Sequence, residues 1–154
     1  MAYSDLKRAA LAFLACGLAV YGVVYMDVVL RARAAYLEGE KYLEWDRRPE
    51  LKRAHLDALL ARKESRLRRE RQAGRFSDEE LAQRLTLARF ERDEAMKESA
   101  LKYAFVWFQT AVELFSPPES RWVRLSRRKM AAARELWKKE LDAKKIPYQD
   151  YMLD

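Results

Sequence analysis

Residues 9–30 read AALAFLACGLAVYGVVYMDVVL and carry no charge before Asp27. A helix of roughly 20 mostly apolar residues, rising about 1.5 Å per residue, crosses a hydrocarbon core of about 30 Å. Such a segment must be helical, because its backbone polar groups find no other partners in lipid. Basic residues flank it on both sides: Lys7, Arg8, Arg31 and Arg33. We interpret residues 9–30 as a transmembrane anchor and residues 1–8 as a short tail.

Three other interpretations of this stretch stay open. A cleaved signal peptide has an apolar region of about 7 to 15 residues and then a cleavage site of small residues, whereas this run continues well past Ala15. Lipidation of Cys16 is suggested by the lipobox-like Phe13-Leu14-Ala15-Cys16, although the following residues stay apolar through Met26. A buried core helix would have a polar face, which this stretch lacks.

Basic residues near the two ends of the span give little bias in orientation. Two basic residues, Lys7 and Arg8, precede the span, and three, Arg31, Arg33 and Lys41, follow it. A short tail that keeps its two charges in the cytoplasm directs the rest of the chain outward. We therefore expect a single-pass protein whose soluble domain is extracytoplasmic.

The composition predicts an all-α chain of modest size. It has 154 residues, 36% of them charged, and only four glycines and four prolines. Few helix breakers and many good helix formers are typical of a helical protein. The net charge of +7 favours anionic partners. The single cysteine, Cys16, excludes an intrachain disulfide.

Breakers and caps divide the chain after the anchor into one helical domain, residues 31–145. A first helix, 31–45, continues the anchor, and Pro49 favours a new helix start. Ser77 and Glu80 have the spacing of a capping box, and Pro117 stops the helix that they open. We expect a small antiparallel bundle of long helices over residues 31–45, 49–73, 77–115 and 119–144, followed by an extended tail, 146–154.

A basic cluster occupies the end of the second helix. The segment contains seven basic residues and only two acidic ones, Glu64 and Glu70. The seven basic residues are Arg62, Lys63, Arg66, Arg68, Arg69, Arg71 and Arg75. Such charges bind phosphates readily, but they are also typical of a solvated helix end. Because aromatic side chains do not alternate with them, base stacking has no platform. We do not expect nucleic-acid binding here.

Aromatic residues are concentrated in the last part of the chain. Aromatic side chains dominate the energetics of interfaces where they are exposed. We predict that they supply the core and part of a docking surface. The candidate partner-binding residues are Tyr103, Trp107, Phe108, Phe115, Trp122, Trp137, Tyr148 and Tyr151.

Residues 104–125 resemble part of a tetratricopeptide repeat. Ala104, Phe108 and Ala111 fall on the small, aromatic and small positions of its second helix, Pro117 near its terminal proline, and Trp122 with Leu125 near the opening pair of the next repeat. A weaker resemblance to the same repeat lies in residues 36–58, at Gly39, Tyr42 and Ala58. Ser126 replaces a usual glycine, and the helix from Ser77 lacks the turn between paired helices. The resemblance implies a helical hairpin that binds proteins.

Motifs for chemistry are sparse. One histidine, His55, and one cysteine make no zinc set. Glu91, Glu94 and Glu98 lack the Glu-x-x-His pairs of bundle di-metal sites, and we interpret them as partners of ion pairs. We expect no cofactor and no enzymatic activity.

The sequence therefore predicts a membrane-anchored scaffold or adaptor, a structural subunit of a membrane-associated assembly whose partners are other proteins. Two alternatives stay open. One is a peripheral binder of anionic lipid or nucleic acid through the basic cluster, and the other is an accessory subunit of a membrane enzyme. The oligomeric state, homomeric or heteromeric, is not specified by these residues.

Overall fold

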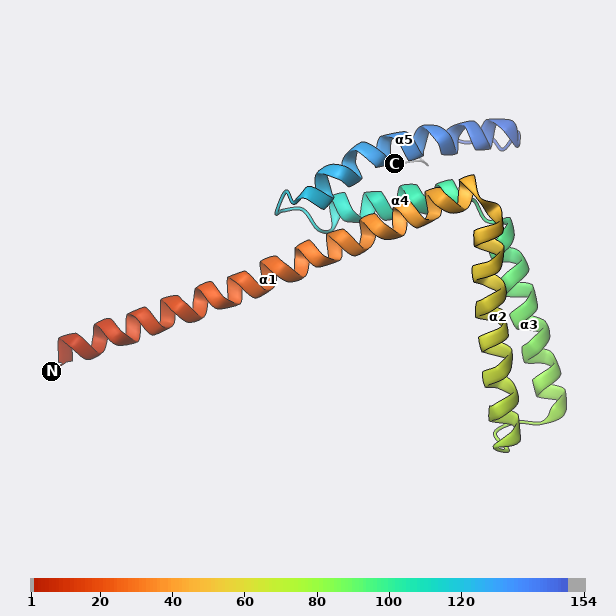
Figure 1. The fold of residues 1–154 in the computed structure, drawn as a ribbon, viewed down its shortest axis with the longest axis horizontal. Coiled ribbons are helices and arrows are strands. Elements are labelled where there is room, and N and C mark those ends of the chain that lie inside the picture. Colours follow the sequence, from red (N-terminus) through yellow and green to blue (C-terminus); the bar gives the residue numbers. More distant parts are fainter. Residues whose placement is uncertain (1, 150–154) are drawn as a thin grey trace.

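The structure is a computed structural model that describes residues 2–149, with side chains for Arg8 and from Leu11 onward. The described chain consists of five α-helices joined by turns (Figure 1). They are α1 Ala2–Arg47, α2 Pro49–Gln72, α3 Asp78–Lys97, α4 Ala100–Glu113 and α5 Arg121–Ala143. The predicted all-α fold is confirmed, and so is the predicted long apolar helix near the amino end.

The first helix, α1, is unbroken over 46 residues. Its first part projects alone from the molecule, and its second part is a wall of the folded core (Figure 1). The prediction that the helix over 31–45 continues the apolar stretch is confirmed. The apolar stretch is thus joined to the folded core by a single helix rather than by a loop.

The second part of α1 packs with α4 and α5 in a three-helix bundle. α4 runs antiparallel to α1, and α5 runs antiparallel to α4 (Figure 1). Lys129 on α5 pairs with Glu40 on α1 at 3.1 Å. The core cluster of this bundle consists of Leu43, Leu101, Ala104, Phe105, Phe108, Ala133 and Trp137.

α1 and α4 approach each other closely at Gly39. A Cβ atom built on Gly39 would lie 2.6 Å from Cε1 of Phe108, whose side chain is fully buried. A contact that short leaves no room for any other side chain, because a core ring cannot move aside cheaply. Glycine at this position therefore lets the two helices pack directly on each other.

The second unit is an antiparallel pair, α2 and α3, which we call the arm (residues 49–97). It leaves the end of the bundle and points away from the axis of α1 (Figure 1). Pro49 occupies the first turn of α2, as predicted from its preference for that position. Few side chains are buried in the arm: Lys52 and Leu67 on α2 and Ala88 on α3.

The turn of the arm is specified locally. Gly74 has a φ of +73°, which favours glycine. At the start of α3, the backbone N–H of Glu80 donates to the Ser77 hydroxyl at 3.2 Å, and the Ser77 N–H donates to the Glu80 carboxylate at 3.0 Å. The predicted capping box is confirmed.

The prediction of one helix over 77–115 is wrong. α3 ends at Lys97, Glu98 adopts an extended conformation with ψ of 143°, and α4 starts after Ser99. The Ser99 hydroxyl accepts the backbone N–H of Lys102 at 3.1 Å and so acts as an N-cap. The break allows α3 to stay on α2 while α4 turns onto α1. The last predicted helix, 119–144, agrees with α5 to within two residues.

Candidate functional site

The largest exposed apolar surface belongs to the first part of α1. Every described side chain from Leu11 to Asp27 is exposed, including Phe13 at 83% and Tyr21 at 69%. This helix is long and apolar enough to cross a membrane. Cys16 is a free, exposed cysteine within it. Soluble proteins rarely expose an apolar surface of this extent.

The apolar surface ends where the bundle begins. Asp27 and Arg31 form an ion pair at 2.7 Å one turn apart. Val28 and Val29 are half-buried, and Ala32 and Ala35 are 0% and 2% exposed. Small alanine side chains let a neighbouring helix approach closely, so the transition from exposed to packed helix takes little more than one turn.

An aromatic cluster lies directly beyond this transition. The ring of Tyr36 lies 5.8 Å from that of Phe108 and 5.5 Å from that of Trp122. The guanidinium groups of Arg33 and Arg121 lie 5.7 Å and 5.6 Å from the centroid of Trp122, which is cation–π distance. Trp122 thus joins α5 to α1 at the end of the bundle that faces the apolar stretch.

Two of the predicted docking residues are core residues instead. Phe108 is 0% exposed and Trp137 is 9% exposed. Both face the interior because α4 is covered by α1 on one side and by α5 on the other, so their prediction as partner-binding residues is corrected. The remaining described candidates are half-buried: Tyr103, Trp107, Phe115, Trp122 and Tyr148. Tyr151 lies outside the described residues.

Other apolar side chains are more exposed than any of these and were not singled out by sequence. Leu114 at the end of α4 is 70% exposed, and Leu87 and Phe90 on α3 are 55% and 59% exposed. Leu87 and Phe90 are three residues apart and therefore share a face of the arm. Leu114 stands directly before the turn that contains Pro117, a position that could have marked it as a surface residue.

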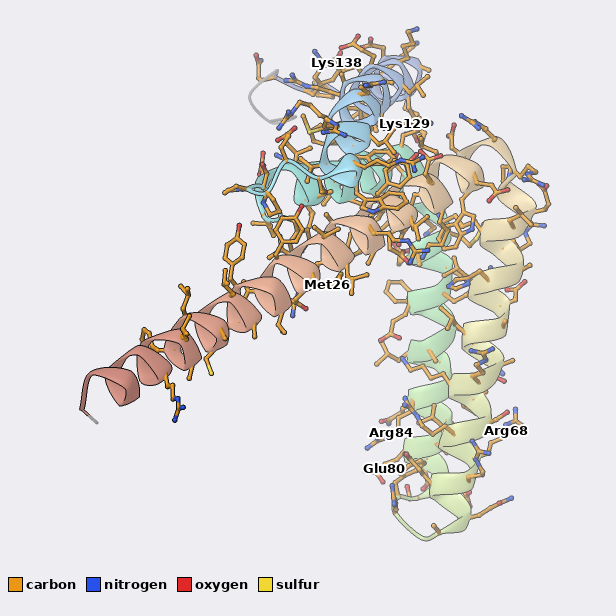
Figure 2. The ribbon with its side chains drawn as sticks, turned by 60° about the vertical axis from the view of Figure 1, so that its left-hand side comes forward. Met26, Arg68, Glu80, Arg84, Lys129 and Lys138 are labelled. Carbon is orange, nitrogen blue, oxygen red and sulfur yellow. The ribbon has the colours of Figure 1, made fainter. Side chains whose placement is uncertain are left out.

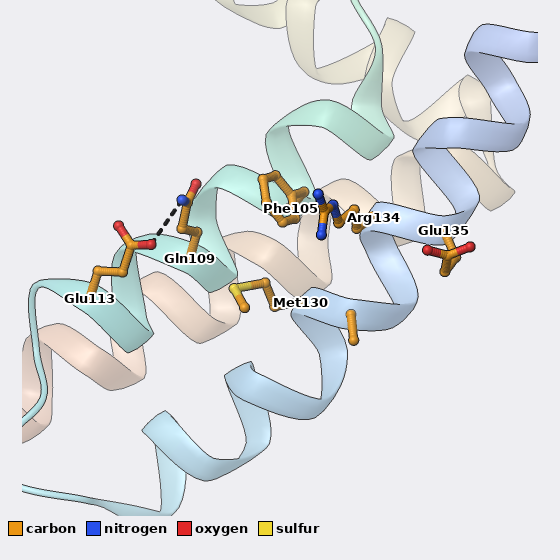
Figure 3. A pocket seen from close by; sticks show the side chains of 7 residues that line it. Phe105, Gln109, Glu113, Met130, Arg134 and Glu135 are labelled. Atoms are coloured by element: carbon orange, nitrogen blue, oxygen red, sulfur yellow. Dashed lines mark hydrogen bonds between the residues drawn. The ribbon is translucent and has the colours of Figure 1, made fainter. Parts of the chain in front are cut away.

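A pocket of about 310 Å³ lies between α4 and α5. Phe105 and Met130 form its apolar wall, and Gln109, Arg134 and Glu135 line its rim (Figure 3). The Gln109 amide donates to Glu113 at 2.9 Å. A mixed lining of this kind suits a side chain or a short segment of a partner rather than a buried cofactor.

The basic cluster lies on α2 and the turn after it. Figure 2 shows Arg68, with Glu80 and Arg84 of α3, at the end of the arm far from the bundle. Four members of the cluster pair with carboxylates: Lys63 with Glu91, Arg68 with Glu64 at 3.5 Å, Arg71 with Asp78 at 2.7 Å, and Arg75 with Glu70 at 3.6 Å. Within the described residues, no ion pair involves Arg62, Arg66 or Arg69. More than half of the cluster is therefore neutralised within the arm.

Lys52 connects the arm to the start of α4. Its side chain is 8% exposed, and its ammonium group donates to the backbone carbonyls of Met96 at 3.1 Å and Glu98 at 2.7 Å. These carbonyls lie at the carboxyl end of α3, where intrahelical donors are missing and a cation is favoured. Burial lowers the pKa of Lys52, while the charge of Glu98 opposes that shift.

Replacing Lys52 by methionine is expected to destabilise the protein by about 1–3 kcal/mol, because the carbonyls of Met96 and Glu98 lose a charged donor that is itself buried. Chemical denaturation of the full chain in micelles measures the change. Lys63→Met is the matched control, since Lys63 pairs with Glu91 on the surface, and it should cost less than about 1 kcal/mol. Equal effects of the two substitutions would contradict the capping role.

Tyr103 lies beside the same break. Its hydroxyl donates to the carboxylate of Glu98, and its ring stacks on that of Tyr42 at 5.3 Å. The hydrogen bond to Glu98, with burial as the second cause, raises the pKa of Tyr103 to about 12 from an ordinary value of 10.0. The folded protein therefore holds this proton more tightly than the unfolded chain does.

The stability contributed by Tyr103 is expected to be complete below pH 10 and to decline as the pH rises to about 12. In that window the unfolded chain has lost the proton and the folded chain still binds it, so unfolding becomes more favourable. Tyr103→Phe should flatten this part of the curve of unfolding free energy against pH. An unchanged slope in Tyr103→Phe would refute the assignment.

Candidate metal ligands do not gather in one place. Among the residues that the structure describes, no group of three His, Cys, Asp or Glu side chains could hold a metal ion. His55 packs against Trp45 with ring centroids 5.0 Å apart. Glu91 pairs with Lys63 and Glu94 with Lys97, as the sequence predicted for these carboxylates.

Comparisons with protein-family models, with curated proteins and with solved structures find no match for this chain. Its function is therefore inferred from its own surfaces.

Proposed function

We propose that the protein is a single-pass membrane protein and a non-enzymatic scaffold subunit of a membrane-associated assembly. The observation that carries this proposal is the continuity of α1, which runs without a break from the exposed apolar stretch into the bundle core. A helix of this kind fixes the bundle relative to the bilayer. A protein that only needed tethering would function with a flexible linker.

The arm is the part of the molecule suited to binding partners. It is long, it points away from the bundle (Figure 1), and it exposes Leu87 and Phe90 on one face of α3. Exposed apolar pairs with a charged surround are common in protein interfaces. The pocket between α4 and α5 offers a second contact on the bundle.

A tetratricopeptide-like pairing of α1 with α4 is part of this proposal. The contact of Gly39 on α1 with Phe108 on α4 supports it, whereas Ala58 lies on α2 in the arm. The arm would then be an insertion between the two helices of one repeat. That arrangement would account for the absence of a short turn between them in the sequence.

For the side of the membrane, we propose that the bundle is extracytoplasmic, with Lys7 and Arg8 held in the cytoplasm. Labelling of an engineered cysteine on the arm, Glu79→Cys in a Cys16→Ala background, tests this in intact cells. A membrane-impermeant maleimide should react before lysis. Reaction only after lysis would reverse the assignment.

The scaffold role is tested by photo-crosslinking in native membranes. A photoreactive amino acid at Leu87 or Phe90 should give discrete adducts of higher mass, and the same probe at Glu79 is the control. Recovery of a lone monomer, with no adduct from any exposed position, would refute the role. Homomeric and heteromeric assemblies are distinguished by the mass of the adduct.

Salt separates the scaffold role from binding through the basic cluster. Contacts through Leu87 and Phe90 should persist as salt rises, whereas phosphate contacts weaken steeply. The three members without ion pairs in the described structure, Arg62, Arg66 and Arg69, are the ones to replace by glutamine. If association is lost on that replacement and on raising salt, the anionic-surface alternative is favoured.

A further inference from the structure

The turn between α4 and α5 is unusually apolar for a surface turn. Residues 114–118 read Leu-Phe-Ser-Pro-Pro. Leu114 is 70% exposed and Phe115 is half-buried. Leu114 is the C-cap residue of α4. A single exposed leucine is ordinary on a protein surface, so its meaning depends on where the turn lies on the bundle.

The antiparallel register of α1 and α4 places this turn along α1. Tyr42 stacks on Tyr103, and Gly39 and Tyr36 both contact Phe108. Two further helical turns along α4 bring Phe115 level with residues 29–32 of α1. Figures 1 and 2 agree that the turn lies at the end of the bundle from which the apolar part of α1 emerges.

The same level is where a bilayer surrounding the apolar stretch would end. A hydrocarbon core of about 30 Å takes roughly 20 residues of helix, which from Ala9 reaches the region of Val28. Asp27 and Arg31 form their ion pair at this point. The turn therefore lies at the height of the lipid headgroups.

The side chains next to the turn suit that environment. Trp122 is half-buried, and tryptophan is enriched at membrane interfaces. Arg33 and Arg121 flank its ring, and Arg124 is exposed one turn further along α5. Guanidinium groups close to the phosphates of anionic lipids are attracted to them. Charge and apolarity thus both complement a lipid surface.

We propose that the α4–α5 turn is a second membrane contact, in which Leu114 enters the interfacial layer and Arg33 and Arg121 bind the phosphates of anionic lipids. This inference rests on the proposed membrane anchor. With two contacts, the bundle cannot rotate freely about α1, and the arm is held in one orientation over the bilayer.

The test uses the full chain with Cys16→Ala in lipid nanodiscs of phosphatidylcholine and phosphatidylglycerol. A single cysteine carries an environment-sensitive fluorophore at Leu114→Cys, at Leu18→Cys within the apolar stretch, or at Leu136→Cys, the matched exposed leucine of α5. Spin-labelled lipids quench at headgroup depth or deep in the acyl chains. We expect the shallow lipid to quench the Leu114 label several-fold more than the Leu136 label. The deep lipid should quench the Leu18 label.

The outcomes separate the two proposals. If the Leu18 label is quenched and the Leu114 label matches that at Leu136, the turn is aqueous and the inference fails while the anchor stands. If the Leu18 label is not quenched either, the anchor fails and the inference fails with it. Arg121→Gln should reduce shallow quenching at Leu114 only when phosphatidylglycerol is present, and an unchanged signal would overturn the role of Arg121.

Discussion

Replacing Leu14 and Leu18 by arginine is expected to prevent stable insertion of α1 into the membrane. Each arginine near the centre of a spanning helix costs about 2.5–3.5 kcal/mol on insertion scales, and each lost leucine adds a few tenths more. Both side chains are exposed, at 60% and 64%, so the substitutions disturb no packing within the chain. The double variant should move from the alkali-resistant membrane fraction to the alkali-extractable fraction.

The control places the same charges on exposed apolar positions of the arm. Leu59→Arg with Leu87→Arg, at residues that are 45% and 55% exposed, should leave the protein alkali-resistant. A Leu14→Arg, Leu18→Arg variant that resists alkali extraction would refute the anchor.

The intact mass of the membrane-bound protein decides among the other interpretations of the same stretch. The full chain has a mass of 18.2 kDa. Loss of the first residues would indicate a cleaved signal peptide, and an added lipid mass would indicate modification of Cys16. An unmodified full-length mass in the membrane fraction supports the spanning helix.

Replacing Phe108 by alanine is expected to lower the free energy of unfolding by about 3–5 kcal/mol, the usual cost of truncating a fully buried phenylalanine. The ring is the largest side chain buried completely in the described bundle, and it contacts both Tyr36 and the backbone at Gly39. Phe90→Ala is the matched control, because Phe90 is 59% exposed on the arm. Denaturation in micelles, followed by circular dichroism, measures both.

The contact with Gly39 predicts a sign reversal between two backgrounds. Gly39→Ala in the native protein adds a Cβ at 2.6 Å from the Phe108 ring, and the strain should cost about 1–3 kcal/mol. In the Phe108→Ala background the ring is gone, so the same change should gain about 0.5–1 kcal/mol from helix propensity. Equal effects of Gly39→Ala in the two backgrounds would contradict direct packing of α1 on α4.

The Leu14→Arg, Leu18→Arg variant and the Gly39→Ala variant test the two parts of α1. The first part of α1 is exposed and apolar, and the second part is a core element of the bundle. Because α1 is continuous, the bundle keeps a fixed direction relative to the apolar stretch.

Local signals in the sequence were sufficient wherever the structure depends on neighbouring residues. Three such signals determine the conformation of residues close to them in sequence. They are the apolar run of residues 9–30, Pro49 and the Ser77–Glu80 capping box. The corresponding helix and helix starts were accordingly predicted correctly.

The break at Glu98 and Ser99 could not be predicted in this way. Residues 77–115 contain no glycine or proline, and a serine within such a run is a weak local signal. The break is stabilised by Lys52, which is more than 40 residues distant in sequence and caps the end of α3. It is favoured because α4 buries more apolar surface on α1 and α5 than it would on the thin arm.

The division of the aromatic residues between core and surface was also decided by the tertiary structure. Phe90 and Phe108 both stand in helical segments, and composition alone does not distinguish them. Only the packing of α4 between α1 and α5 buries Phe108 and leaves Phe90 in solvent. The sequence by itself determined that this chain is helical and carries a stretch fit to span a bilayer, because those properties depend on local propensity and on apolar length. The tertiary structure decided where the predicted helix over 77–115 breaks and which apolar side chains remain exposed, because burial depends on contacts between segments distant in sequence.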